Sequence, residues 1–354
     1  MKRSSARLHL LPKSKGRRAL KRMNIATNST AERARNLEVS IAPPAEALSG
    51  RSFKDAISAC LRWLLLSGWN GCDSLAPRPN LWVTAYVLAR LAEVSSAYLP
   101  ADLKIRIEQA LASLEHSQIP GSGWSPDGCK PPDAFTTSWA IIALRAHRRR
   151  IPRAAINLLL ACRQSNGGFT AYPASQSGDS DNPSCPEITV TALRALNMCD
   201  RDGGDFLTSR LRNELSCTLA GKSLRFYICS EILDWEDGLA PWPLVSLVTQ
   251  SAVQFDLESA HDQALLLRML LRLRNQRARL AAAALQKMQM ADGSWPGFAL
   301  PELSAMSSTA CNLLSSRETG LIASVTALSA LAMNELQPGL CYRADMRPTW
   351  RLRD

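Results

Sequence analysis

The chain has 354 residues, of which 46% are hydrophobic and 21% are charged, a normal balance for a globular protein. Its net charge of +11 is uneven, because residues 1–22 hold nine Lys or Arg and no acid, while the rest of the chain has 33 basic residues against 31 acidic ones. This nearly neutral body does not predict a nucleic-acid-binding face.

Residues 1–50 are expected to form a basic, disordered tail. The Arg-rich, acid-free start is typical of an organelle-targeting peptide, and a gene start placed too early, with Met23 as the true start, is the alternative. Contact of the tail with an acidic membrane surface also stays open. The run LHLL is too short for the apolar core of a secretory signal, and no stretch reaches the length that spans a bilayer.

The ten cysteines include no CxxC pair, and most of them lie in or beside helical patterns. This spacing favours small buried thiols over a disulfide framework. We therefore expect a reduced, cytoplasmic protein.

A Gly-aromatic turn followed by an apolar helix recurs along the chain. The turns are SGWNG at 67–71, GSGWS at 121–125, NGGFT at 166–170 and DGSWP at 292–296, with a degenerate copy DGLAPWP at 237–243. The helical segments align without gaps and are VTAYVLARL at 83–91, TTSWAIIAL at 136–144, ITVTALRAL at 188–196 and ASVTALSAL at 323–331. Their second position is always a small hydroxyl residue (Thr84, Thr137, Thr189 and Ser324). Because each segment is apolar nearly all round, we expect helices that are buried on both sides.

Amphipathic helices precede the turns, as in ADLKIRIEQALASLEHSQ at 101–118, where apolar residues recur at helical spacing. The unit recurs roughly every fifty residues, and no run of alternating apolar residues predicts a strand. We predict an all-α protein, an α/α toroid with an inner and an outer ring of helices, over residues 51–336, followed by a C-terminal tail at 337–354. An open solenoid is the alternative, but both helices of a solenoid repeat keep an exposed edge.

Two of the turns resemble the QW motif of the squalene-hopene and oxidosqualene cyclases, in which a Gln is followed by Gly and an aromatic residue. They are RQSNGGF at 163–169 and QMADGSW at 289–295, and HSQIPGSGW at 116–124 is a looser copy. The resemblance covers roughly residues 51–335 and implies an α/α toroid, which protein prenyltransferase β subunits share. It also implies a cyclase-like protein that acts on an isoprenoid or another hydrophobic small molecule, as an intramolecular transferase, isomerase or lyase, without a metal or cofactor.

The resemblance also implies an acidic site. The cyclases carry a D-x-D-D-T-A motif at the start of one inner helix, and its middle Asp donates the proton that starts cyclisation. If Thr189 matches the Thr of this motif, Glu187 takes the place of the donor, with Cys185 and Ile188 in place of its acidic neighbours. The equivalent positions of the other repeats hold apolar residues (Trp82, Phe135 and Ile322).

Glu187 has a structural alternative. A carboxylate is favoured in the first turn of any helix, and Pro186 marks such a start. The helix dipole favours the charged form by roughly 0.3–1 kcal/mol, whereas full burial raises the pKa of a carboxyl by up to ~3–5 units, so a proton donor at this place needs burial. Asp179 and Asp181, in the preceding polar loop, are candidates to tune such a donor, and solvated loop residues are the alternative.

Aromatic residues on the inner helices are candidates to line a substrate cavity, because ring faces stabilise carbocations. These candidates are Trp82, Tyr86, Phe135 and Trp139, together with Asp133, which matches the first Asp of the motif in its own repeat. Core packing is the alternative for the aromatic residues, and an N-cap like Asn80 is the alternative for Asp133. Four other tryptophans belong to the turns (Trp69, Trp124, Trp242 and Trp295).

Three functions stay open. The first is protonation-initiated (class II) cyclisation or isomerisation of an isoprenoid. Full cyclases place the cavity between two helical domains, so here it needs a partner chain or a smaller substrate. The second is a non-catalytic toroid that binds a hydrophobic ligand or a partner peptide. The third is a prenyltransferase β-subunit-like protein. Such subunits bind zinc, but no histidine is expected to begin an inner helix beside an Asp and a Cys (His9, His116, His147 and His261).

Overall fold

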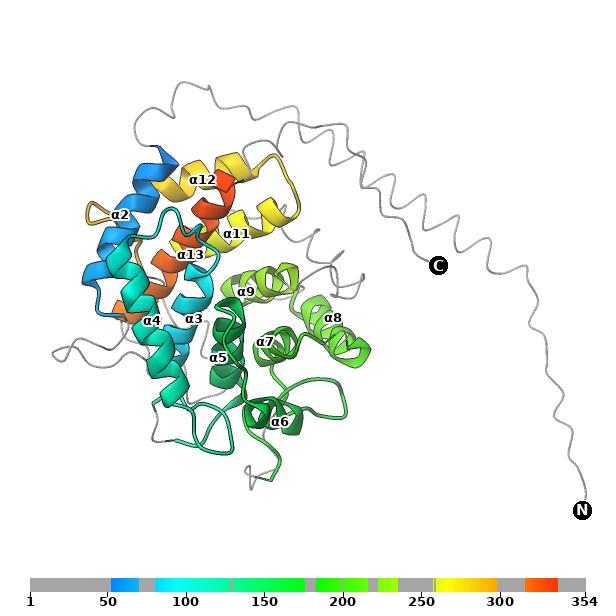
Figure 1. Ribbon diagram of the computed structural model, residues 1–354. Coiled ribbons are helices and arrows are strands. Elements are labelled where there is room, and N and C mark those ends of the chain that lie inside the picture. Colours follow the sequence, from blue (N-terminus) through cyan, green and yellow to red (C-terminus); the bar gives the residue numbers. More distant parts are fainter. Residues whose placement is uncertain are drawn as a thin grey trace, which may run out of the picture. The chain divides into compact units, whose positions relative to one another are not determined.

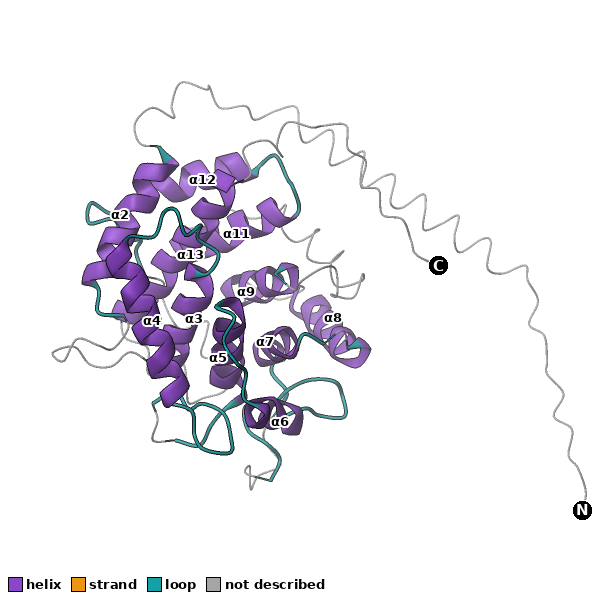
Figure 2. Cartoon of the chain, viewed as in Figure 1, coloured by secondary structure: helices purple, strands orange, loops and turns teal. Residues whose placement is uncertain are grey.

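The computed structural model describes residues 52–69, 80–127, 130–175, 183–198, 200–215, 222–234, 257, 259–297 and 316–336. All of them belong to the unit Arg51–Asp354, and their regular secondary structure is helical (Figure 2). Isolated β-bridges join Phe169 to Arg163 and to Cys185. The predicted tails, residues 1–50 and 337–354, lie outside the described residues, so their boundaries stay predictions.

Six of the described helices form a closed inner ring, in which each helix contacts the next and the last contacts the first (Figure 1). In ring order they are α3 (Leu81–Leu91), α5 (Ala134–Ala146), α7 (Pro186–Leu196), α9 (Lys222–Leu233), α11 (Ala260–Arg272) and α13 (Ser316–Leu336). The closure of the ring between α13 and α3 confirms the predicted ring of buried helices and excludes an open solenoid.

The other described helices lie outside this ring. They are α2 (Phe53–Leu66), α4 (Ala101–His116), α6 (Arg153–Ala161), α8 (Arg201–Leu215) and α12 (Ala278–Lys287). The last four pack against the inner helix that precedes them, and α2 packs against α13. Buried residues recur at helical spacing, as Leu103, Ile107 and Leu111 do in α4, so one face of each helix covers the ring and the opposite face meets solvent.

The turn and the small hydroxyl of each repeat bind one another. The backbone N–H of Trp124 donates to Thr137 Oγ1 (3.0 Å), and the N–H of Trp295 donates to Ser324 Oγ (2.9 Å). Each Trp also caps the outer helix before it, because its indole N–H donates to a backbone carbonyl there, that of Leu114 in α4 or Leu285 in α12. These bonds confirm the turn assignment of the two tryptophans and explain why turn and helix recur together. Trp242 lies outside the described residues.

The glutamine of the turn motif closes the turn on itself. Gln289 Nε2 donates to the Gly293 carbonyl (2.9 Å), and Gln118 Nε2 donates to the Ser122 carbonyl (2.8 Å), in both cases six residues before the aromatic residue. In the third copy that position holds Arg163, whose guanidinium instead binds Asp200 (2.8 Å). In RQSNGGF the glutamine of the sequence match, Gln164, therefore lies one residue after the position that Gln118 and Gln289 occupy in their turns.

Two inner helices, α9 and α11, were not among the four segments matched by sequence. The sequence indicates an amphipathic helix around His261, but every residue from Ala260 to Leu271 in α11 is buried. Gln263 stands at the position of the small hydroxyl residue, and its Nε2 donates to the Ala281 carbonyl of α12 (3.2 Å). A longer polar side chain thus makes a link between the rings in place of the hydroxyl, and this substitution hides the repeat.

Among the described helices, α13 alone is long and apolar enough to cross a membrane by length and composition, although no such stretch was expected from the sequence. Within Arg317–Leu336, 78% of the apolar window is buried inside the protein. The helix packs against α2, α3, α11 and α12, so its apolar surface completes the ring.

Candidate functional site

One stripe of side chains on each inner helix faces the interior of the ring. Residues spaced by four and three positions share a helix face, and side chains on these stripes reach helices that are not ring neighbours. Arg90 of α3 binds Asp234, which directly follows α9, although α5 and α7 lie between the two helices on one side. Trp139 of α5 lies beside Tyr227 of α9 in the same way (ring centroids 6.5 Å apart). Such contacts are made across the interior, so these stripes point inward.

The residues of these stripes form three layers, stacked one on another from the N-terminal to the C-terminal ends of the inner helices. The first layer, at the start of the inner helices, contains Trp82, Phe135, Glu187, His261 and Ile322. The middle layer contains Tyr86, Trp139, Thr191, Tyr227 and Thr326. The last layer, towards the C-terminal ends, is charged and contains Arg90, Glu93, Arg194, Glu231, Asp234, Arg268 and Ser329.

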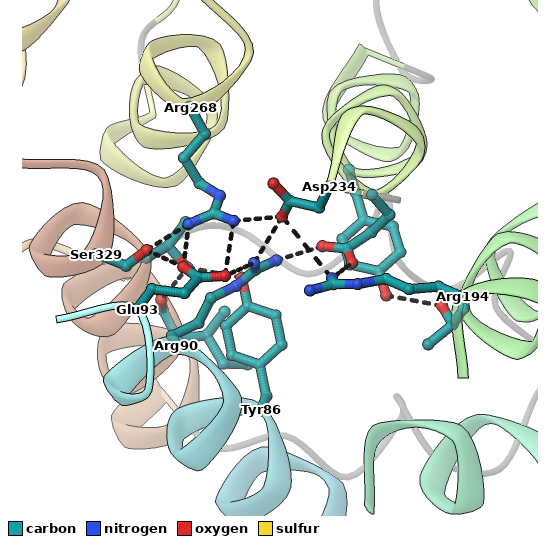
Figure 3. Close-up of polar contacts among 12 residues, drawn as sticks. Tyr86, Arg90, Glu93, Arg194, Asp234, Arg268 and Ser329 are labelled. Atoms are coloured by element: carbon teal, nitrogen blue, oxygen red, sulfur yellow. Dashed lines mark hydrogen bonds and ion pairs between the residues drawn. The ribbon is translucent and has the colours of Figure 1, made fainter. Parts of the chain in front are cut away.

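The charged layer is a buried ion-pair network (Figure 3). Arg90 donates to Asp234 (2.9 Å), to Glu93 (3.1 Å) and to Glu231. Arg268 lies opposite and donates to Glu93 (3.0 Å) and to Asp234. Both guanidinium groups are fully buried, so their charges are compensated by the acids and not by water.

The remaining members tie further helices into the network. Arg194 of α7 binds Glu231, Ser329 of α13 binds Glu93, and Arg272 reaches Asp234 from the end of α11 (3.3 Å). Burial alone would raise the pKa of Glu93, but Arg268 and Arg90 lower it to about 2. Burial likewise opposes ionisation of Asp234, but Arg268, Arg194 and Arg90 hold its pKa well below the usual range. Glu93 and Asp234 therefore stay charged at neutral pH.

The aromatic middle layer lies directly on these cations. The rings of Tyr86 and Trp139 are 4.6 Å apart, and the Arg90 guanidinium lies 4.9 Å from the Tyr86 centroid and 5.5 Å from that of Trp139. Arg194 lies 5.8 Å from the centroid of Trp139. The face of each ring that could attract a cation is thus partly used by the protein itself. These two substrate-binding candidates separate the charged layer from the first layer.

In the first layer, four helices place a distinctive side chain at their second position. Trp82 and Phe135 contact each other edge to face (5.4 Å between centroids), as two of the proposed cavity residues. Glu187 and His261 hold the same position in α7 and α11. Burial, together with the charge of Arg90, lowers the pKa of His261 to about 3, so this imidazole is neutral at pH 7. The sequence did not mark His261 as an inner-helix residue, because α11 lacks the small hydroxyl that marks four of the other inner helices.

Glu187 is only 1% exposed. It lies in the first turn of α7, which begins at Pro186 and has no side-chain cap at Cys185. It also lies four residues before Thr191, which contacts Tyr227 of α9, and seven before Arg194, which binds Glu231. Glu187 therefore combines the first-turn position with burial on the inward stripe of α7, the condition that a proton donor at this place requires.

Asp133 lies at the N-cap of α5, which is the alternative to a place in the cavity lining. Its Oδ1 accepts the backbone N–H of Thr136 (2.8 Å), and Asn80 caps α3 in a similar way through the N–H of Trp82 (3.4 Å). Burial raises the pKa of Asp133 to about 6. The pKa of the Cys162 thiol is raised to about 12, mainly by its own burial and to a smaller extent by the charge of Asp133. Since Cys162 follows the outer helix α6, Asp133 lies near the junction between the two rings.

Asp179 and Asp181 fall in residues 176–182, outside the described part of the chain, so their proposed tuning role stays a prediction. The described residues contain no group of three or more His, Cys, Asp or Glu side chains placed to hold a metal ion. The charged layer was missed by the sequence analysis, although a signal exists. Arg90 is the one charged residue of α3 and Arg194 is the one cation of α7, and each lies near the end of a mostly apolar helix.

The sequence matches no family model and no curated protein. Solved structures do match. The apo structure of the type II terpene cyclase MstE from Scytonema aligns with a TM-score of 0.58 at 18% identity, over 79% of this chain and 97% of that one. A protein from Actinoplanes aligns with a TM-score of 0.60 at 19% identity, over 80% of this chain and 100% of that one. The chain has a terpene cyclase-like α/α toroid fold.

This likeness confirms the predicted α/α toroid fold. A further match is a variant of MstE in complex with geranylgeranyl dihydroxybenzoate, described as its substrate (TM-score 0.54, 19% identity, over 79% of this chain and 97% of that one). The alignment covers nearly the whole of that MstE chain. The expected need for a partner chain or a smaller substrate stays a prediction.

Proposed function

We propose that this protein is a type II terpene cyclase-like enzyme that cyclises or isomerises an isoprenoid, with Glu187 as the proton donor. The main support for this proposal is that Glu187, on the inward stripe of α7, is buried and only 1% exposed. An acid held away from water has its charged form disfavoured, which is what a donor to an alkene requires. The terpene cyclases of the same fold support the choice of an isoprenoid, since one is described in complex with a geranylgeranyl substrate.

The reaction balances without a cofactor. The Glu187 carboxyl loses its proton as a C–H bond forms at one carbon of a terminal alkene, which leaves a cation at the other carbon. A neighbouring double bond attacks that cation and forms the ring C–C bond. The final cation loses a proton to form a new double bond, so the product is an isomer of the substrate.

His261 is a suitable acceptor for the last proton. It is buried, it occupies the same position of α11 that Glu187 occupies in α7, and its depressed pKa keeps it neutral at pH 7. Return of the proton from His261 to Glu187 restores both groups. Trp82 and Phe135 share this layer and offer ring faces to the intermediate cation.

A non-catalytic toroid that binds a hydrophobic ligand is the second candidate. The observation that favours it is the pairing of Tyr86 and Trp139 with Arg90, which takes up ring faces that a carbocation would need. The replacement of the motif's acids by Cys185 and Ile188 points the same way. The prenyltransferase-like alternative has no specific observation in its favour.

Incubation with geranylgeranyl diphosphate, farnesyl diphosphate and squalene, followed by chromatography and mass analysis, tests the proposal. We expect a product of unchanged mass and altered retention time from one of them, absent with Glu187→Gln. Asp133→Asn, which removes a buried carboxyl outside the inward stripe, is the matched control and should retain activity. Tight binding without conversion, unaffected by Glu187→Gln, would favour the non-catalytic toroid. Conversion that persists in Glu187→Gln would remove this residue from the mechanism.

A further inference from the structure

All six inner helices end on the same side of the ring. The charged layer joins the C-terminal parts of α3, α7, α9, α11 and α13, and α5 joins them through Arg145, which donates to the Ala195 carbonyl at the end of α7 (2.7 Å). The loops that follow α5 and α11 therefore lie at this same end. Two inner helices separate α5 from α11 in either direction around the ring, so the loops lie on opposite sides (Figure 1).

These two loops and the outer helices that follow them are basic and free of acid. Residues 147–161 contain four Arg and no Asp or Glu. Residues 273–287 contain three Arg, one Lys and again no Asp or Glu. The net charge of the chain beyond residue 22 is nearly zero, and this sum hides the asymmetry because the acids lie in other segments.

Arg148 and Arg274 hold the same structural position after α5 and α11. Both have a left-handed backbone, with φ values of 57° and 52°. In each case the next residue donates back to the helix, Arg149 to the Leu144 carbonyl and Asn275 to that of Leu270 (both 2.8 Å). Left-handed positions at helix ends favour Gly or Asn, because a larger side chain strains the backbone there. Asn197 holds the equivalent position after α7, with φ 52°, so local stability does not explain the two arginines.

The outer helices show the same conflict. Arg153 is the first residue of α6, and Arg277 is the N-cap of α12, where the positive end of the helix dipole disfavours a cation. The outer helices α2, α4 and α8 begin at the same end of the ring but carry an acid in their first turn, as the dipole favours (Asp55, Asp102 and Asp202). The outer helices α6 and α12, on opposite sides of the ring, thus begin with cations at a place where an anion would stabilise the helix.

The side chains at this end are available to a partner. Arg148, Arg150, Arg153 and Arg274, here named the basic end face, are exposed and have no ion-pair partner among the described residues. Exposed aliphatic residues lie near the same end, Ile105 (56% exposed) in the second turn of α4 and Leu280 (49% exposed) at the start of α12. Basic groups interleaved with exposed aliphatic groups are typical of surfaces that meet a lipid headgroup layer.

We propose that the basic end face docks on an anionic phospholipid bilayer. Lipid is favoured over nucleic acid because the aliphatic side chains of Ile105 and Leu280 fit the boundary between headgroups and acyl chains, whereas a phosphate backbone offers them nothing apolar to contact. The docking is independent of the proposed catalytic function, since the first layer with Glu187 lies at the other end of the inner helices.

Vesicle sedimentation of the full chain tests this docking. We would compare phosphatidylcholine vesicles with vesicles containing about one-third phosphatidylserine. Arg148→Asn/Arg274→Asn removes two charges and relieves the left-handed backbone. The matched control Arg62→Asn/Lys287→Asn removes two exposed charges near the C-terminal ends of the outer helices α2 and α12, at the opposite end. The basic residues 1–22 are the same in all variants.

We expect the end-face variant to bind the anionic vesicles about tenfold more weakly than wild type, with the control within about twofold. The thermal midpoint of the end-face variant should not fall, which separates lost docking from lost folding. An equal loss in both variants would overturn the proposal, because net charge alone would then explain binding. Equal binding to neutral vesicles would also overturn it. Loss of single-stranded RNA binding with unchanged vesicle binding would replace the membrane with a nucleic acid.

Discussion

Arg90 Nη1 lies 2.9 Å from Asp234 Oδ2, although 144 residues separate the two side chains in the sequence. The pair spans the interior of the ring from α3 to the end of α9, and Arg268 of α11 binds the same carboxylate oxygen. Burying such charges costs desolvation energy that is offset only when every charge has close partners. The network therefore favours one arrangement of the inner helices, because any slip of one helix would leave a buried charge uncompensated.

Arg268→Met tests this dependence. The substitution leaves Glu93 and Asp234 with less compensation in a buried site, so we expect the free energy of unfolding to fall by about 3–5 kcal/mol. Urea titration followed by circular dichroism would measure it. Arg272→Met is the matched control, since Arg272 binds Asp234 but is 45% exposed, and it should cost about 1 kcal/mol or less. Equal losses in both variants would show that burial of Arg268 is not the cause.

The same network predicts acid sensitivity. The pKa of Glu93 is lowered to about 2 in the folded protein and that of Asp234 is lowered further, so both contribute stability that is present above their unfolded pKa values and is lost as pH falls through the folded ones. We expect the thermal midpoint to decline steadily from about pH 4.5 towards pH 2. Glu93→Gln should make this decline shallower, and a decline of unchanged slope would contradict the assignment.

Asp133 predicts the opposite dependence. Its pKa is raised to about 6 by burial, so its contribution to stability is fully present below the unfolded pKa, near 3.8, and is lost as pH rises to about 6. Asn keeps a side-chain oxygen for the cap of α5 without the charge. We therefore expect Asp133→Asn to raise the free energy of unfolding at pH 7, by up to roughly 3 kcal/mol, with little effect at pH 4. Destabilisation at pH 7 would show that the cap needs the ionised carboxylate.

Thr137→Val tests the link between turn and inner helix. The hydroxyl accepts the buried N–H of Trp124, and its loss leaves that donor unsatisfied, so we expect a cost of about 1–3 kcal/mol in thermal or urea unfolding. Ser138→Ala is the control. The Ser138 hydroxyl donates only to the Ala134 carbonyl of its own helix, so its removal leaves no buried N–H group without an acceptor. Costs of equal size would argue against the link.

His261→Phe tests the proton acceptor of the proposed reaction. Phe fills a similar apolar volume at the start of α11 but accepts no proton, so product formation should fall by about tenfold or more while substrate binding is retained. The readout is product yield by mass analysis beside ligand binding by fluorescence. If yield is unchanged, the final proton leaves by another route.

Local pattern in the sequence determined the repeat unit, because a helix buried on both sides must be apolar all round and a tight turn needs Gly beside its anchoring aromatic residue. The segments around Thr84, Thr137, Thr189 and Ser324 show this pattern. The N-cap at Asp133 was also predictable, because it depends only on residues next to it in the sequence. The inner helix α11 escaped detection because Gln263 makes its link between the rings with a different side chain.

The burial of Glu187, the partners of Arg90 and the gathering of Arg148 and Arg274 at one end were decided only by tertiary structure. Each depends on how far one helix is rotated and shifted against others that lie scores of residues away. Periodicity within a helix carries no record of that relation, because the desolvation and Coulomb energies that fix it arise only when the ring closes. Sequence thus set the apolar pattern of the repeat, and ring closure set which polar side chains are buried and which of them meet.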